Sequence, residues 1–123
     1  MRKFLLGFLL AVLFACPVLA DPCVPVTSVE LIPYDDVGDP WVFGKMLDYF
    51  FDVIILPGNA TNKNYSLELY DPYDQIDRTG WLHIVEQEED YVILYFEATG
   101  DYLLTIRTED GPFKSYEIFV GNK

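Results

Sequence analysis

A chain of 123 residues suits a single domain, and its 51% hydrophobic and 16% aromatic content excludes an intrinsically disordered protein. The formal net charge is −12, because 20 aspartates and glutamates outnumber 8 lysines and arginines. So acidic a surface repels phosphate backbones and anionic lipid headgroups, and we therefore expect no nucleic-acid partner.

The first 20 residues have the pattern of a secretory signal peptide. Arg2 and Lys3 precede an uncharged apolar run over residues 4–15, which is too short to cross a bilayer. Val18 and Ala20 are small enough for signal peptidase I, so we expect cleavage after Ala20 and no membrane span. The chain would then be secreted, periplasmic or at the cell surface, with one domain over residues 21–123.

A second interpretation of this segment is a lipoprotein signal. Leu13-Phe14-Ala15-Cys16 resembles a bacterial lipobox, and modification of Cys16 would provide a lipid anchor. Cleavage after Ala20 would instead remove Cys16 and leave Cys23 as the only cysteine, with no internal disulfide. In that case the stability of the domain must come from its core.

After the leader, short apolar or alternating segments separated by turn residues predict strands along the whole chain. Turns are indicated by acidic, glycine- or proline-containing stretches such as Asp35–Pro40, Pro57–Lys63 and Glu109–Pro112. The residues between the turns predict strands at 26–32, 45–56, 65–69, 81–85, 91–97, 102–106 and 114–120, with a shorter one ending near 80.

No segment after the leader has helical length and period. Seven or eight short strands in one small domain predict an all-β Greek-key sandwich. The strand alternation places one set of side chains in a shared core: Val53, Ile55, Tyr65, Leu67, Leu104, Ile106 and Ile118.

Several segments resemble bacterial immunoglobulin-like domains of group 2, the modules repeated in intimin- and invasin-type surface proteins. Leu56–Lys63 resembles the connection between the second and third strands of the family, and Val26–Pro33 its opening strand. Ile76–Gly80 matches the family's V-D-x-x-G, and Ala98–Ile106 resembles its closing motif. The sequence departs from the family at Leu67, where a tryptophan is usual.

The resemblance implies an immunoglobulin-like sandwich with a non-enzymatic role outside the cytoplasm. Modules of this kind serve in protein interaction, adhesion or scaffolding. The implied partners are proteins or glycans of the cell envelope or of the exterior.

Tyr102 has the spacing of a tyrosine corner, since it follows Gly100-Asp101 and precedes Leu104 by two residues. In such a corner the phenol hydroxyl bonds backbone near the start of a strand. We therefore expect a structural role for Tyr102.

The sequence contains few residues that could carry catalysis. His83 is the only histidine and alternates with apolar neighbours on the polar side of its strand, so we expect a solvated imidazole and no enzyme. Two acidic turns invite a calcium interpretation, but neither has the register of a calcium loop. We expect no cofactor and no metal there, and interpret these aspartates as solvated turn residues: Asp35, Asp36, Asp39, Asp71, Asp74 and Asp77.

An alternative function is carbohydrate binding by a small sandwich. Trp41, Tyr73 and Trp81 could serve as stacking platforms, with nearby carboxylates accepting bonds from sugar hydroxyls. The competing interpretation of these aromatic residues is packing in the core or between the sheets. An exposed, coplanar pair of rings would favour the sugar-binding function.

Overall fold

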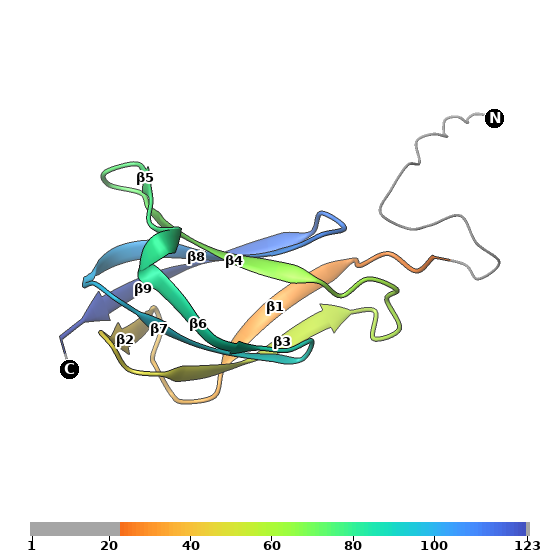
Figure 1. Ribbon diagram of the computed structural model, residues 1–123, viewed down its shortest axis with the longest axis horizontal. Helices are drawn as coiled ribbons and strands as arrows, with labels where there is room; N and C mark the ends of the chain where they lie inside the picture. Colours follow the sequence, from red (N-terminus) through yellow and green to blue (C-terminus); the bar gives the residue numbers. More distant parts are fainter. Residues whose placement is uncertain (1–22, 123) are drawn as a thin grey trace.

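A computed structural model describes residues 23–122, which form a two-layer β-sandwich (Figure 1). The expected leader and Cys16 lie outside these residues. The strands are β1 (Ser28–Pro33), β2 (Trp41–Gly44), β3 (Tyr49–Leu56), β4 (Tyr65–Asp71), β5 (Ile76–Asp77), β6 (Leu82–Gln87), β7 (Tyr91–Phe96), β8 (Gly100–Thr108) and β9 (Phe113–Gly121), with one short 3₁₀ helix, η1 (Thr79–Trp81).

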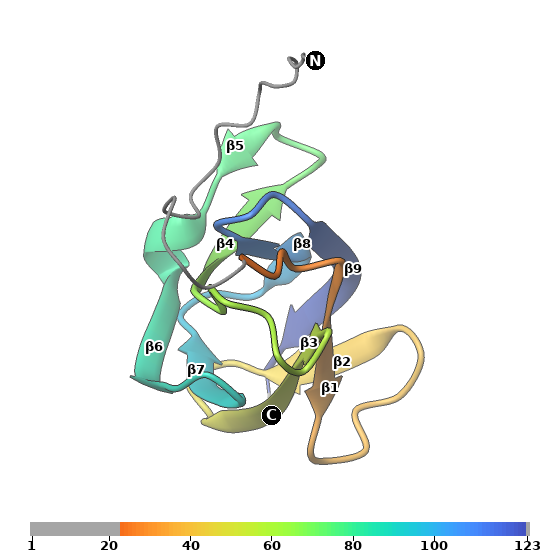
Figure 2. The ribbon, with the colours of Figure 1, turned by 90° about the vertical axis from the view of Figure 1, so that its right-hand side faces the viewer.

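The two sheets have the strand order of an immunoglobulin-type sandwich. One sheet runs β1-β3-β7-β6, the order of the A-B-E-D sheet of that fold. The other runs β2-β9-β8-β4-β5, in which β9-β8-β4 has the order of the G-F-C sheet and β2 and β5 are additional edge strands. Figure 2 shows the first sheet below and β4, β8 and β9 above it. The prediction of an all-β sandwich is confirmed, and none of the helices within residues 23–122 is long and apolar enough to cross a membrane.

The described residues contain nine strands, where seven or eight were expected. The strand predicted over residues 45–56 begins only at Tyr49, because Met46 adopts a left-handed turn conformation with φ 65°. Before this turn, Trp41–Gly44 forms β2, which pairs in parallel with the last strand. The chain therefore leaves the first sheet after β1, joins the second sheet as β2, and returns as β3.

The core lies between the sheets and contains every side chain predicted to share it: Val53, Ile55, Tyr65, Leu67, Leu104, Ile106 and Ile118. An aromatic cluster fills one end. Phe43 of β2 is fully buried, with ring centroids 4.8 Å from Tyr49, 5.6 Å from Phe51 and 5.1 Å from Phe96. The cluster joins β2 to strands of the opposite sheet.

Tyr102 forms the predicted tyrosine corner. Its hydroxyl donates to the carbonyl oxygens of Ala98 and Thr99, at 3.1 and 3.0 Å. Gly100 has φ +151°, and a Cβ atom there would lie 3.0 Å from the Tyr102 hydroxyl. The corner thus fixes the start of β8 and requires glycine beside it.

Cys23 is disulfide-bonded in this structure and is not a free thiol. The expectation of a lone Cys23 therefore applies only to a chain cleaved after Ala20.

Tyr65 ties β4 to the turn between β6 and β7. Its hydroxyl donates to the carbonyl oxygens of Glu88 and Tyr91, at 2.5 and 3.2 Å. Burial, reinforced by the negative charges of Asp90 and Glu88, raises the pKa of Tyr65 well above its ordinary value.

This pKa shift predicts a loss of stability in alkali. The pKa of Tyr65 is higher in the folded state than its unfolded value of about 10, so folding disfavours the phenolate. The contribution of Tyr65 to stability is therefore complete below about pH 10 and is lost as the pH rises from there through the folded-state pKa. We expect the free energy of unfolding of the wild type to fall above about pH 10, and to fall less steeply in Tyr65→Phe. Denaturant titrations at pH 9–12 would measure both slopes.

The exposed Tyr34 supplies a control, since Tyr34→Phe removes a phenol that does not cross-link the sandwich. Equal slopes for Tyr65→Phe and the wild type would contradict the prediction. Other tyrosines also contribute to the wild-type slope, since the hydrogen bond to Glu86 and burial raise the pKa of Tyr91 to about 12.

Candidate functional site

The outer face of the β1-β3-β7-β6 sheet is apolar. In β3 and β7 the residues alternate, so that Tyr49, Phe51, Val53 and Ile55 enter the core while their neighbours point to solvent. We name the outward set the β3–β7 face: Ile32, Phe50, Ile54, Leu56, Tyr91, Ile93 and Tyr95. All of these side chains are half-buried or exposed. Phe50 lies directly opposite Ile93, and Asp52 lies on the same face between Ile32 and Tyr91.

The rings on this face are ordered by contact with one another. Phe50 stacks on Tyr91 with centroids 5.2 Å apart and an interplanar angle of 14°, and it meets Tyr34 edge-to-face at 5.8 Å. Tyr95 stacks on His83 of β6 at 4.7 Å and 11°. A surface of fixed aromatic rings loses little side-chain entropy when a partner covers it.

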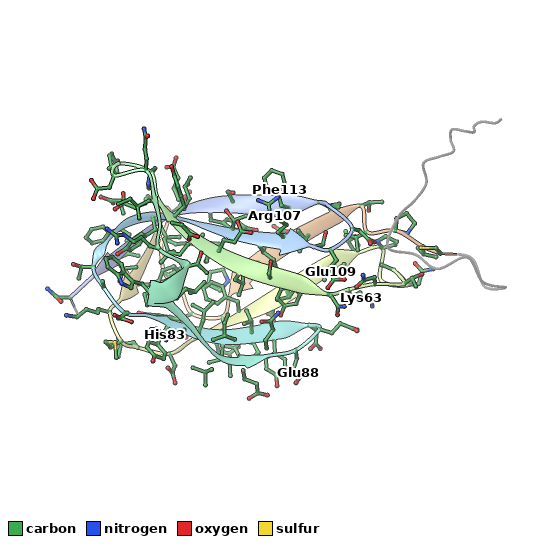
Figure 3. All side chains as sticks on the ribbon, turned by 45° about the horizontal axis from the view of Figure 1, so that its top comes forward. Lys63, His83, Glu88, Arg107, Glu109 and Phe113 are labelled. Atoms are coloured by element: carbon green, nitrogen blue, oxygen red, sulfur yellow. The ribbon has the colours of Figure 1, made fainter. Side chains whose placement is uncertain are left out.

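The face carries negative charge and no strong cation. The sequences of β1, β3, β6 and β7 contain no lysine or arginine, whereas Glu30, Asp52 and Glu86 lie in them. Figure 3 shows His83 and Glu88 on this layer, away from Arg107 and Phe113 on the other sheet. At the β1 edge, Lys114 Nζ of the other sheet lies 3.9 Å from Glu30 Oε2.

A groove of about 440 Å³ extends the face past the edge of β1. Ile54 and Leu56 line it on one side, and Phe113 at the start of β9 on the other. Across the same edge the backbone N–H of Leu31 donates to the Tyr116 hydroxyl at 2.8 Å. The apolar surface therefore continues from the sheet onto the end of the sandwich.

The structure does not gather the three predicted platform residues on one surface. Trp41 is half-buried and stacks on Tyr116 at 4.4 Å, and it also packs against Phe51. Trp81 is half-buried in η1, where it meets Tyr102 edge-to-face and lies 4.1 Å below the Arg78 guanidinium. Both tryptophans therefore pack within the sandwich.

Tyr73 alone of the three projects into solvent, with 78% of its surface exposed. It lines a second groove, on the outer face of the other sheet, and neither tryptophan belongs to the lining of that groove.

The His83 side chain, expected to be a solvated imidazole, is partly exposed and also pairs with a carboxylate. Its Nε2 lies 2.6 Å from Glu97 Oε1, and its ring lies on Tyr95. These contacts place His83 at the margin of the β3–β7 face.

The acidic turns use their carboxylates to hold backbone. Asp71 Oδ1 accepts from the N–H groups of Tyr73 and Asp74, each at 3.0 Å. Asp77 accepts from the hydroxyl and N–H of Thr79, and these two bonds keep its pKa below the ordinary value. Within residues 23–122, no group of three or more histidines, cysteines, aspartates and glutamates could hold a metal ion.

The β3–β7 face was missed at the sequence level, although a signal for it is present. Tyr91–Phe96 is an unbroken apolar run, and Tyr49–Leu56 contains only one charged residue. Such runs are typical of strands that are covered on both faces. Among residues 23–122 the opposite sheet covers only the inner faces of β3 and β7, and no further layer of these residues covers the outer faces.

Comparison with known proteins adds no relative to this picture: no protein-family model matches the chain, and no curated protein matches it.

Proposed function

We propose that this chain is a non-enzymatic, extracytoplasmic immunoglobulin-like module that binds a partner protein through the β3–β7 face. The observation that carries the proposal is an apolar, aromatic sheet face with no lysine or arginine in its four strands. Motifs such as Leu56–Lys63 and Ile76–Gly80 support membership of the bacterial group 2 family, and the leader supports export.

The composition of the face favours a protein over a sugar. The central parts of protein interfaces are enriched in tyrosine and phenylalanine and depleted of charge. The β3–β7 face likewise has Phe50, Tyr91 and Tyr95 among aliphatic side chains. Sugars bind in concave sites with several convergent polar groups. The β3–β7 face is a sheet surface with mostly aliphatic and aromatic side chains.

The charges specify the partner further. If two copies of this chain met at this surface, the carboxylates Glu30, Asp52 and Glu86 of both copies would be brought together, at a cost added to the repulsion between net charges of −12. A partner with an apolar centre and lysine or arginine around it would complement the face. We therefore assign the face to a different, basic protein surface.

Photo-cross-linking in the cells that make the protein tests this proposal. We expect a photoreactive phenylalanine derivative at Ile54 to give an adduct with one other protein, because Ile54 is exposed on the outer face of β3 and lines the adjoining groove. The matched control is the same group at Ser66, an exposed residue on the outer face of β4.

An adduct from Ile54 alone would support the assignment. Equal adducts from Ile54 and Ser66, no adduct from either, or an adduct of Ile54 only with a second copy of this chain would each overturn it.

A further inference from the structure

The second groove lies on the opposite side of the sandwich, between the β4–β5 hairpin and strands β8 and β9. Figure 1 shows this hairpin projecting from the end of the sheet. The groove has a volume of about 330 Å³, with Pro72 and Tyr73 on the hairpin side and Leu103 and Phe119 on the strands. Asp101 and Glu117 also line it.

The strand register sets the carboxylates around the apolar residues. Asp101 lies directly opposite Phe119, and Glu117 directly opposite Leu103. Asp101 and Glu117 are exposed and form no ion pair with any of residues 23–122. The groove thus presents two uncompensated negative charges beside an exposed ring, and the residues that line it include no lysine, arginine or histidine.

The other end of the same sheet face has a similar arrangement with its cation in place. Arg107 lies opposite Phe113, and its guanidinium carbon is 4.6 Å from the centroid of that ring. The same guanidinium meets Glu68, with Nε 3.2 Å from Oε2. Figure 3 shows Arg107 and Phe113 next to each other on this sheet. A planar guanidinium suits such a site because it stacks on a ring while it donates to a carboxylate.

Two further cations of the described residues lie over aromatic rings. Arg78 lies over Trp81 at 4.1 Å, and Lys114 lies over Tyr116 at 5.6 Å while it approaches Glu30. Phe119 is a surface ring with flanking carboxylates over which none of these cations lies.

We infer that the groove at Phe119 binds the guanidinium of an arginine side chain presented by a partner protein. The guanidinium plane stacks on the ring of Phe119 or Tyr73, and Asp101 and Glu117 balance its positive charge. The inference is independent of the β3–β7 face, which lies on the other sheet.

The groove is held in shape before any ligand arrives. The carboxylate of Asp71 closes the turn that carries Tyr73, and the corner hydrogen bonds of Tyr102 fix the start of β8 next to Asp101. A preformed site lowers the ordering cost of binding, which matters for a ligand as small as one side chain.

A titration of the ¹⁵N-labelled protein, followed by its amide NMR shifts, tests the inference. The probe is a blocked tripeptide, acetyl-Gly-Arg-Gly-amide, and its match contains citrulline, which has the same shape without the charge. We expect saturable shifts at Tyr73, Asp101, Leu103 and Phe119 with the arginine peptide, and binding about tenfold weaker with citrulline.

Two variants separate this site from general attraction to an acidic protein. Glu117→Gln should weaken binding of the arginine peptide about tenfold, and Phe119→Ala by a similar factor. Glu89→Gln removes the same charge from an exposed position outside the groove and should change the affinity less than about twofold.

The inference is overturned if the citrulline peptide binds as tightly as the arginine peptide, if Glu89→Gln weakens binding as much as Glu117→Gln, or if no shift saturates. Saturable shifts with a neutral disaccharide and none with the arginine peptide would replace arginine by a sugar as the ligand. None of these outcomes bears on the cross-linking from Ile54, so the two assignments can fail separately.

Discussion

Replacing Phe43 by alanine is expected to lower the free energy of unfolding by about 3–5 kcal/mol. Phe43 is 0% exposed, and its ring packs against those of Tyr49, Phe51 and Phe96. Truncation removes the buried ring and leaves a cavity that the neighbouring aromatic residues cannot fill without leaving their rotamers. The loss is a large part of the total stability of a small domain, which is about 5–15 kcal/mol.

Urea titration with tryptophan fluorescence would measure the effect, since Trp41 lies beside Phe43 at a centroid distance of 6.1 Å. Phe113→Ala is the matched control, because it removes a phenylalanine ring that is 58% exposed. This loss should cost less than about 1 kcal/mol. Phe43→Leu keeps most of the volume and remains measurable if the alanine variant does not fold. A cost below about 1 kcal/mol for Phe43→Ala would mean that β2 does not close this end of the core.

The fold could be predicted because its signals are local. Strands such as Tyr65–Asp71 alternate buried and exposed positions with period two, and each is followed by turn residues. The same alternation identified the seven predicted core residues, since a side chain of an edge or central strand can face only one of two directions. Tyr102 was predictable for a similar reason, because its hydrogen-bond partners are three and four residues away.

The elements that escaped prediction depend on partners far along the chain. Trp41–Gly44 is only four residues long, and it becomes a strand through its parallel pairing with Ile118–Gly121. No pattern within so short a segment specifies which distant strand will pair with it.

The candidate site shows the same division. Whether Trp41 and Trp81 are platforms or packing residues depends on Tyr116 and Tyr102, which approach them only in the folded sandwich. The β3–β7 face has a local signal in the apolar run Tyr91–Phe96, but its exposure follows from the absence of a covering layer among the described residues. Sequence patterns report the apolar character of a strand and leave its cover to the tertiary structure.

The most direct test of the β3–β7 face is the affinity of the cross-linked partner for two variants with matched exposure. Ile54 and Tyr70 are both 38% exposed, but Ile54 lies on the outer face of β3 and Tyr70 on that of β4 in the other sheet. An aspartate at either position adds a negative charge at the surface without entering the core.

Isothermal titration calorimetry of the purified partner with each variant gives the comparison. We expect Ile54→Asp to weaken binding at least about thirtyfold, because a charge would replace an apolar contact of the interface. Tyr70→Asp should stay within about threefold of the wild type, with both variants unfolding at the wild-type temperature. Equal affinities for Ile54→Asp and the wild type, or a larger loss for Tyr70→Asp, would contradict the assignment of the β3–β7 face.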